Sequence, residues 1–241
     1  MIIDKIKRLV EEYRRNHKNE ISLLKELNWA NIYHDSIRGK KWLQDLPLNI
    51  GRWAGDYVFF YVLNRILIDC KPKNILEFGL GESSKFVSVF LDNYLNESNH
   101  LIIEQNISWY ERFVSNFKLS TKTQVKICEV VTKLVNGQET SVYESINELV
   151  NTKYDLYIVD GPIGSKQYSR YNIVELAKVL TSQDDFIIIM DDYNRKGEQQ
   201  TVLELIRVLK DKNIKVQSTV YDGSKSLVVI ATEKYKFLSS L

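Results

Sequence analysis

The sequence has few cysteines, little net charge and no long apolar run. Cys70 and Cys128 do not form a Cys-x-x-Cys pair, so we expect buried free thiols rather than a disulfide or a thiolate metal site. A formal net charge of +2 argues against a surface adapted to nucleic acid or to an anionic membrane. The longest apolar run, residues 57–63, is shorter than the ~20 residues that cross a bilayer. Charged residues near the start also argue against a signal peptide. We therefore expect a cytoplasmic protein without a membrane span.

The length of 241 residues allows a full domain with an appendage, and we place the appendage at residues 1–54 and the main domain at 55–241. Residues 2–27 carry apolar side chains at helical spacing, with His17 and Glu20 on the same stripe. These two polar residues argue against a long coiled coil. We expect a helix or a helix pair that packs on the main domain or forms a homodimer with a second subunit.

Residues 29–53 are irregular and rich in aromatic side chains: Trp29, Tyr33, His34, Trp42 and Trp53. Two interpretations are open for this segment. Its rings either line a pocket for an acceptor molecule or pack the appendage onto the core.

Residues 73–84 are typical of a short apolar strand that breaks at Gly79 and Gly81 and opens into a helix. The two glycines let backbone N–H groups approach a ligand, and Ser83 or Ser84 can cap the helix. Glu77, just before the turn, can accept a hydrogen bond from an amino group of that ligand. The stretch therefore predicts a site for a ligand that carries positive charge.

Apolar runs then alternate with helical segments. We predict strands at 100–104, 125–131, 154–160 and 186–192, and helices at 109–117, 139–150, 173–180 and 198–209. Two β-branched runs at 216–220 and 226–232, joined by Asp222-Gly223, indicate a hairpin. Continuous apolar strands indicate a parallel sheet covered on both faces. The fold class that follows is α/β: a Rossmann-like doubly wound sheet of about seven strands, mostly parallel, with a C-terminal antiparallel hairpin and an N-terminal helical appendage.

Ligands of such sheets bind at the carboxyl ends of the strands. The candidate residues at that edge are Glu77, Gly79, Glu104, Asp160, Asp191 and Asp192. Glu104 lies 23 residues beyond Gly81, at the end of the second strand. Dinucleotide folds place an acid there to accept hydrogen bonds from ribose hydroxyls. The pattern therefore predicts a nucleoside-containing ligand.

On these motifs and the terminal hairpin, residues 55–232 resemble the class I methyltransferases that use S-adenosylmethionine (SAM), with Ser83 in place of the third glycine. The resemblance implies a SAM site formed by Glu77, Gly79, Gly81, Ser83, Ser84, Glu104 and Asp160. An NAD-type Rossmann enzyme is an alternative, but the hairpin disfavours it. A non-catalytic SAM-binding protein is a second alternative, which the loss of the third glycine leaves open.

Residues 159–161 and 189–193 resemble the matching segments of metal-dependent O-methyltransferases, including the macrocin-type sugar enzymes. This resemblance implies that Asp160, Asp191 and Asp192 bind Mg²⁺ or Mn²⁺ and that Asp160 takes part in catalysis. Lys166 is a candidate general base, by analogy with a lysine of the catechol enzymes. The implied reaction is methyl transfer from SAM to a hydroxyl of a saccharide or another small hydroxylated acceptor.

Overall fold

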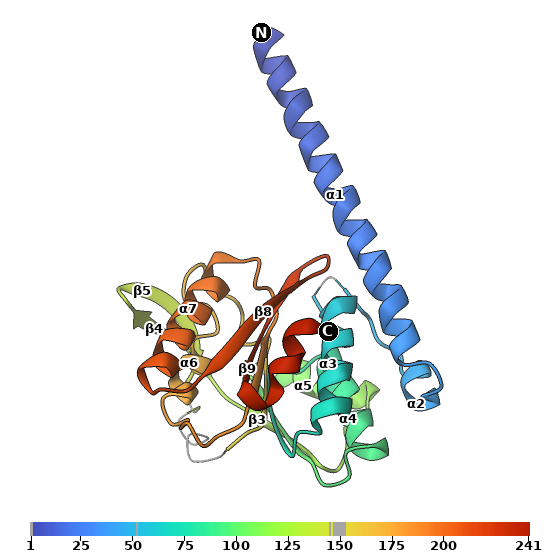
Figure 1. Cartoon of the computed structure of the whole chain (residues 1–241), viewed down its shortest axis with the longest axis vertical. Helices are drawn as coiled ribbons and strands as arrows, with labels where there is room; N and C mark the ends of the chain where they lie inside the picture. The colour runs from blue at the N-terminus through green and yellow to red at the C-terminus, as the bar shows by residue number, and fades with distance from the viewer. Residues whose placement is uncertain (1, 52, 145, 147–152) are drawn as a thin grey trace.

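A computed structural model describes residues 2–51, 53–144, 146 and 153–241. Its centre is a seven-stranded sheet of order β3-β2-β1-β6-β7-β9-β8 (Figure 1). The strands are β1 (Asn74–Phe78), β2 (Asn99–Glu104), β3 (Thr123–Ile127), β6 (Leu156–Val159), β7 (Ile187–Met190), β8 (Val216–Asp222) and β9 (Ser226–Thr232). Strands β1, β2, β3, β6 and β7 run parallel, and the β8–β9 hairpin joins antiparallel to β7. The predicted fold class is confirmed.

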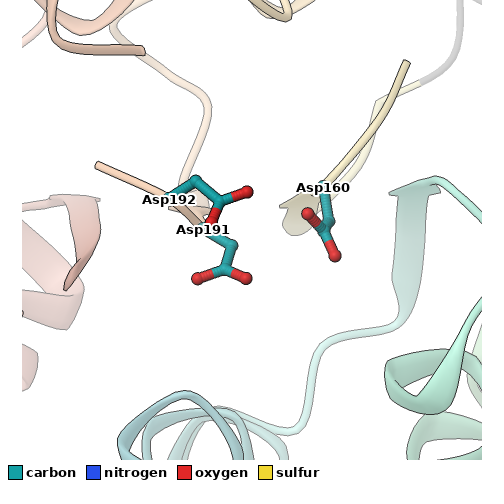
Figure 2. A group of neighbouring side chains, drawn as sticks. All are labelled: Asp160, Asp191 and Asp192. Atoms are coloured by element: carbon teal, nitrogen blue, oxygen red, sulfur yellow. The ribbon is translucent and has the colours of Figure 1, made fainter. Parts of the chain in front are cut away.

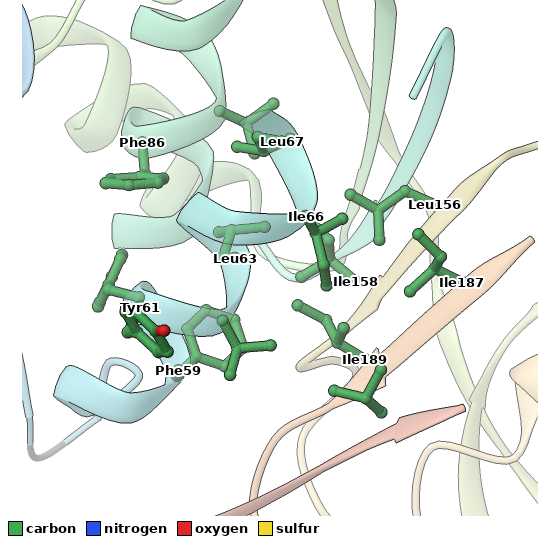
Figure 3. Packing of buried hydrophobic residues seen from close by; sticks show 14 of the residues in the cluster. Phe59, Tyr61, Leu63, Ile66, Leu67, Phe86, Leu156, Ile158, Ile187 and Ile189 are labelled. Atoms are coloured by element: carbon green, nitrogen blue, oxygen red, sulfur yellow. The ribbon is translucent and has the colours of Figure 1, made fainter. Parts of the chain in front are cut away.

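Helices cover both faces of this sheet. They are α3 (Tyr57–Arg65) with the π-helical turn η1 (Ile66–Cys70), α4 (Glu82–Asn93), α5 (Ile107–Asn116), α6 (Asn172–Ala177), α7 (Lys196–Asp211) and the C-terminal 3-10 helix η3 (Glu233–Ser240). Because side chains alternate along a strand, Ile187 and Ile189 pack under α3 and η1 (Figure 3), whereas Ile188 faces the cluster formed with α6 and α7. The central strands are therefore apolar on both sides, as the continuous runs predicted.

One predicted element is wrong. Residues 139–143, expected to begin a helix, lie in strand β5 (Gln138–Tyr143), which pairs with β4 (Val130–Val135) in a separate two-stranded sheet. Asn136 and Gly137 connect the two strands with positive φ angles, the geometry of a tight hairpin turn. Part of the predicted helix, at 145 and 147–150, lies outside the described residues.

The appendage begins with one helix, α1 (Ile2–Ser36), followed by the short α2 (Lys41–Gln44). Its C-terminal end packs on the domain: Tyr33 is buried, and Trp29 Nε1 donates to the Asp222 backbone oxygen at 2.9 Å. Its N-terminal part extends away from the rest of the molecule (Figure 1), and residues 4–20 are exposed. This part does not pack on the main domain, so packing on a second subunit is the expectation that stays a prediction for it.

None of the helices in the described ranges combines the length and hydropathy that a bilayer crossing needs. Cys70 and Cys128 form no disulfide, in agreement with the sequence. A cytoplasmic location stays a prediction.

Asp56 connects the start of α3 to the β8–β9 hairpin. Its Oδ1 accepts from the Phe59 N–H at 3.2 Å as the helix N-cap. Its Oδ2 accepts from the Lys225 N–H at 3.0 Å and from the Ser224 hydroxyl at 3.2 Å. Asp56 is buried, so its carboxylate fixes the hairpin end that carries Lys225.

Asp56→Ala removes the buried acceptor of these three donors and should lower the free energy of unfolding by about 2 kcal/mol. Urea unfolding followed by circular dichroism measures the change. The matched control is Asp45→Ala, at an exposed position, which should stay within about 0.5 kcal/mol of wild type. Equal stabilities of the two variants would contradict the role given to Asp56.

Candidate active site

A cavity of about 1220 Å³ lies at the carboxyl ends of the central strands. Its lining includes the glycine turn after β1, Glu104 at the end of β2, Asp160 and the loop after β6, and Asp192 after β7. Residues 49–51, 53 and 54 of the appendage and the adjoining Gly55 line it too. The volume exceeds that of a pocket for one drug-sized ligand, about 300–1,000 Å³. The cavity is therefore large enough for more than one small ligand.

The glycine turn is closely packed against the end of β6. Gly79 has a φ of +94°, a conformation that side-chain-bearing residues rarely adopt, and a Cβ there would lie 3.2 Å from the Asp160 backbone oxygen. A Cβ on Gly161 would lie 2.8 Å from the Gly79 nitrogen. Gly81 differs, because a Cβ there would meet nothing within 4 Å. Its free space is the cavity, whose wall it forms.

Glu104 is held by backbone donors beside this turn. Its Oε2 accepts from the Leu80 N–H at 2.9 Å, and its Oε1 accepts from the Asn106 N–H at 2.7 Å. Trp109 of α5 lines the cavity next to it and donates from Nε1 to the Leu80 backbone oxygen at 2.7 Å. Trp109 was not among the residues predicted to bind the cofactor. An aromatic residue in the helix that follows the acidic strand end was the available signal.

Two residues assigned to the cofactor do not line the cavity. Glu77 is fully buried; it accepts from the Ser83 hydroxyl and lies 2.9 Å from His100 Nε2. It supports the turn from beneath, so its assignment to a ligand's amino group is corrected. Ser84 is also buried, and its Oγ accepts from the Gly81 N–H at 3.0 Å, as a helix cap. Ser83 lies at the cavity wall, and its contact with a cofactor stays a prediction.

Asp160, Asp191 and Asp192 converge, as the sequence predicted. One carboxylate oxygen from each lies within 4.8 Å of the others. Figure 2 shows Asp191 and Asp192 together at the end of β7, with Asp160 across from them at the end of β6. Three acids gathered at two adjacent strand ends repel one another unless cations accompany them.

The chain supplies these cations itself. Arg170 Nη2 donates to Asp160 Oδ1 at 2.8 Å and to Asp192 Oδ2 at 2.7 Å, and its Nη1 donates to the Asp191 backbone oxygen at 2.7 Å. Lys225 Nζ lies 3.2 Å from Asp191 Oδ2 and 3.6 Å from Asp192 Oδ1. We call these five side chains the charge cluster. Neither Arg170 nor Lys225 was among the site residues predicted from the sequence.

The cluster changes the proton affinity of its members. Burial raises the pKa of Asp160 to about 7; Arg170 opposes this rise, and Asp191 and Asp192 add to it. Burial also raises the pKa of Asp191. Burial alone would lower the pKa of Lys225, but the three aspartates raise it above its usual value, so it stays protonated. Asp160 can therefore gain or lose a proton near neutral pH.

The cluster does not fit a divalent cation. A buried guanidinium, which is always charged, lies between the carboxylates of Asp160 and Asp192. A dication bound to those carboxylates would lie about 4–5 Å from it, given metal–oxygen distances near 2.1 Å. Repulsion from Arg170 and Lys225 opposes such binding. Ligation of Mg²⁺ or Mn²⁺ stays an untested prediction, and we derive no step through a metal.

The remaining predicted residues lie near the cavity mouth or in the core. Lys166 is exposed and lines the cavity. Trp53 also lines it and is 95% exposed. Tyr33 is buried in the core, and Trp42 packs edge-on against Phe90 with ring centroids 4.9 Å apart. The packing interpretation is therefore right for Tyr33 and Trp42, whereas Trp53 is placed as the pocket interpretation requires.

The comparisons with known proteins identify the fold. No protein-family model and no curated protein matches the sequence. A protein assigned as an O-methyltransferase, from Klebsiella pneumoniae, superposes with a TM-score of 0.56 at 12% identity, covering 88% of this chain and 99% of that one. A protein assigned as a caffeoyl-CoA O-methyltransferase, from Staphylococcus aureus, gives 0.52 at 13%, covering 87% and 99%. The O-methyltransferase TomG of Streptomyces achromogenes, involved in tomaymycin synthesis and solved in complex with SAM, gives 0.51 at 12%, covering 85% and 89%. At such identities the similarity shows a shared fold.

Arg170→Gln should lower the free energy of unfolding by about 3–5 kcal/mol, because it leaves buried carboxylates without their cation. Arg195→Gln is the control: this side chain is half exposed and lies 2.9 Å from Asp192 Oδ2, so its loss should cost less than about 1 kcal/mol. Chemical denaturation of both variants measures the difference. Similar small losses for both would show that the charge cluster does not depend on Arg170.

Proposed function

We propose that the protein is a SAM-dependent O-methyltransferase that acts on a hydroxyl of a saccharide or another small hydroxylated acceptor. The observation that carries this proposal is the cavity, which joins the glycine turn and Glu104 at one side to Asp160 and the charge cluster at the other. The fold shared with O-methyltransferases, one of them solved with SAM, supports it.

The cofactor half of the cavity contains the glycine turn, Glu104 and Trp109. Gly81 leaves open space against the backbone, and the buried Glu104 carboxylate has lone pairs beyond those used by its two backbone donors. These groups fit the adenosine part of SAM: ribose hydroxyls donate to the carboxylate, and the indole of Trp109 offers an apolar wall. When bound, SAM supplies a methyl group on a sulfonium, which a hydroxyl oxygen can attack with release of S-adenosylhomocysteine.

Asp160 is our candidate for the group that takes the hydroxyl proton. It lines the cavity, and its pKa of about 7 suits a general base near neutral pH. Arg170 bonds to Asp160 Oδ1 and so fixes the carboxylate. Lys166, the base suggested by analogy, is exposed at the cavity wall and is a less suitable candidate.

We infer that positive charge near the reacting oxygen comes from Lys225 rather than from a divalent cation. The Lys225 ammonium lines the cavity and is held by the Ala54 backbone oxygen at 2.8 Å and by Asp191. A fixed cation there stabilises the alkoxide character that develops on the acceptor oxygen. Mg²⁺ remains the alternative that the resemblance implies.

The acceptor half of the cavity supports a hydroxylated ligand. Asn49, Ser165 and Arg195 provide donors and acceptors there, and Trp53 provides an exposed apolar ring face. We propose that residues 49–51 and 53–55 act as the acceptor lid expected of the appendage. An NAD enzyme and a non-catalytic SAM-binding protein remain the alternatives, and the two experiments below distinguish them.

Gly81→Val should abolish SAM binding without unfolding the protein. The backbone at Gly81 is extended, and the added side chain enters open space, so the fold tolerates it while the cavity wall moves inward. Calorimetry should show micromolar binding of SAM and S-adenosylhomocysteine to wild type, about −8 kcal/mol, and none to the variant. Circular dichroism is the control for folding. Binding of NAD in place of SAM, or unchanged SAM affinity of a folded variant, would contradict the assignment.

Transfer of a labelled methyl group from SAM should be detectable on a panel of monosaccharides and glycans, and kcat/KM should fall as the pH drops through about 7. The rate falls on acidification because Asp160 is protonated below its pKa of about 7 and can then no longer accept the hydroxyl proton. Asp160→Asn should lower the rate by roughly 10²–10⁴. Lys166→Met is the matched control and should retain activity. A flat pH profile, or an active Asp160→Asn variant, would exclude Asp160 as the base, and SAM binding without any transfer would favour the non-catalytic alternative.

A further inference from the structure

The N-terminal part of α1 carries apolar side chains that no other segment of the described chain covers. Eight of them are 42–70% exposed: Ile6, Leu9, Val10, Tyr13, Ile21, Leu23, Leu24 and Leu27. A helix that extends from its domain gains little stability without packing against another surface. An apolar surface of this length indicates an interaction site.

The spacing of these residues defines the geometry of the partner. One row follows alternating intervals of four and three residues: Ile6, Val10, Tyr13, His17, Glu20, Leu24 and Leu27. This is the heptad spacing of a two-stranded coiled coil. His17 and Glu20, which as single residues argued against a long coiled coil, form the middle of the row. Polar residues at core positions of coiled coils specify register and orientation.

We propose that α1 pairs with α1 of a second copy of this chain in an antiparallel coiled coil centred on His17 and Glu20. In a two-fold symmetric dimer, if residue i of one chain faces residue j of the partner, then residue j of the first chain also faces residue i of the partner. The register that places His17 against the partner's Glu20 also pairs Val10 with Leu27 and Tyr13 with Leu24. Each apolar residue in these layers then meets an apolar residue, and each carboxylate of the central layers meets an imidazole.

The flanking positions agree with this register. It places Arg14 beside the partner's Ile21 and Lys7 beside the partner's Asn28, so like charges do not meet. A parallel pair would instead place Glu20 against the partner's Glu20, which is repulsive. A lipid surface is also a poor fit, because it would bury the Glu20 carboxylate, whose neighbour within the same helix is the exposed His17 at 3.9 Å. Charge complementarity therefore selects an antiparallel second copy.

Sedimentation equilibrium of the full chain at micromolar concentration tests the proposal. Wild type should have twice the mass of one chain. Leu24→Glu should raise the dissociation constant of the dimer at least tenfold, because a carboxylate enters an apolar layer. The matched control is Asn19→Glu, which adds the same charge outside the row and should leave the dimer intact.

A charge exchange tests the orientation. His17→Glu places a carboxylate opposite the partner's Glu20 and should weaken the dimer, whereas the double variant His17→Glu, Glu20→Lys should restore it. In a parallel pair the double variant would place glutamate against glutamate at position 17 and lysine against lysine at position 20. The dimer would then not be restored. A monomeric wild type, an intact Leu24→Glu dimer, failure of the double variant, or binding of the monomer to lipid vesicles through this face would each overturn the proposal. SAM affinity should be equal in all variants, so this inference and the proposed function succeed or fail separately.

Discussion

The bonds of Arg170 determine the arrangement of the candidate active site. Its guanidinium joins Asp160 at the end of β6 to Asp192 after β7 and also bonds the Asp191 backbone oxygen. Without a cation at this position, the acids would repel one another in a buried site and the two strand ends would separate. Lys225 adds a second cation from the β8–β9 hairpin. The cluster therefore fixes the position of Asp160, and burial raises the pKa of its carboxyl to about 7, against the opposing effect of Arg170.

The same hairpin connects this cluster to the N-terminal helix. Asp56 accepts from the Lys225 N–H and caps α3, and Glu26 of α1 accepts from the Tyr57 N–H and the Ser224 N–H, each at 3.1 Å. These bonds place the root of α1, the start of α3 and the Lys225 ammonium in one connected unit. If α1 forms the interface between two copies, each cavity lies at the end of a helix fixed by that interface. Hydrogen bonds from backbone N–H groups to the carboxylates of Glu26 and Asp56 thus link the proposed dimer interface to the acceptor side of the site.

Sequence patterns predicted the features that depend on local periodicity. The five parallel strands, the terminal hairpin and the convergence of Asp160, Asp191 and Asp192 follow from apolar runs that end in acids. Residues 139–143 were read as a helix, although Asn136-Gly137 carried the signal of a tight turn. The burial of Glu77 against His100 and the pairing of Lys225 with Asp191 could not be predicted. Glu77 and His100 lie on neighbouring strands, whereas Lys225 and Asp191 lie in two different loops, and one sequence contains no record of which side chains face one another.

The claim that the chain's own cations replace a metal is tested most directly by equilibrium binding of Mn²⁺ to the whole protein, with and without S-adenosylhomocysteine. Electron paramagnetic resonance of the free ion measures it and requires no knowledge of the acceptor. Our account predicts no saturable binding below about 1 mM, corresponding to less than about 4 kcal/mol of binding free energy. Stoichiometric binding with a micromolar Kd that Asp191→Asn abolishes would contradict it, and would assign the three aspartates to a metal site.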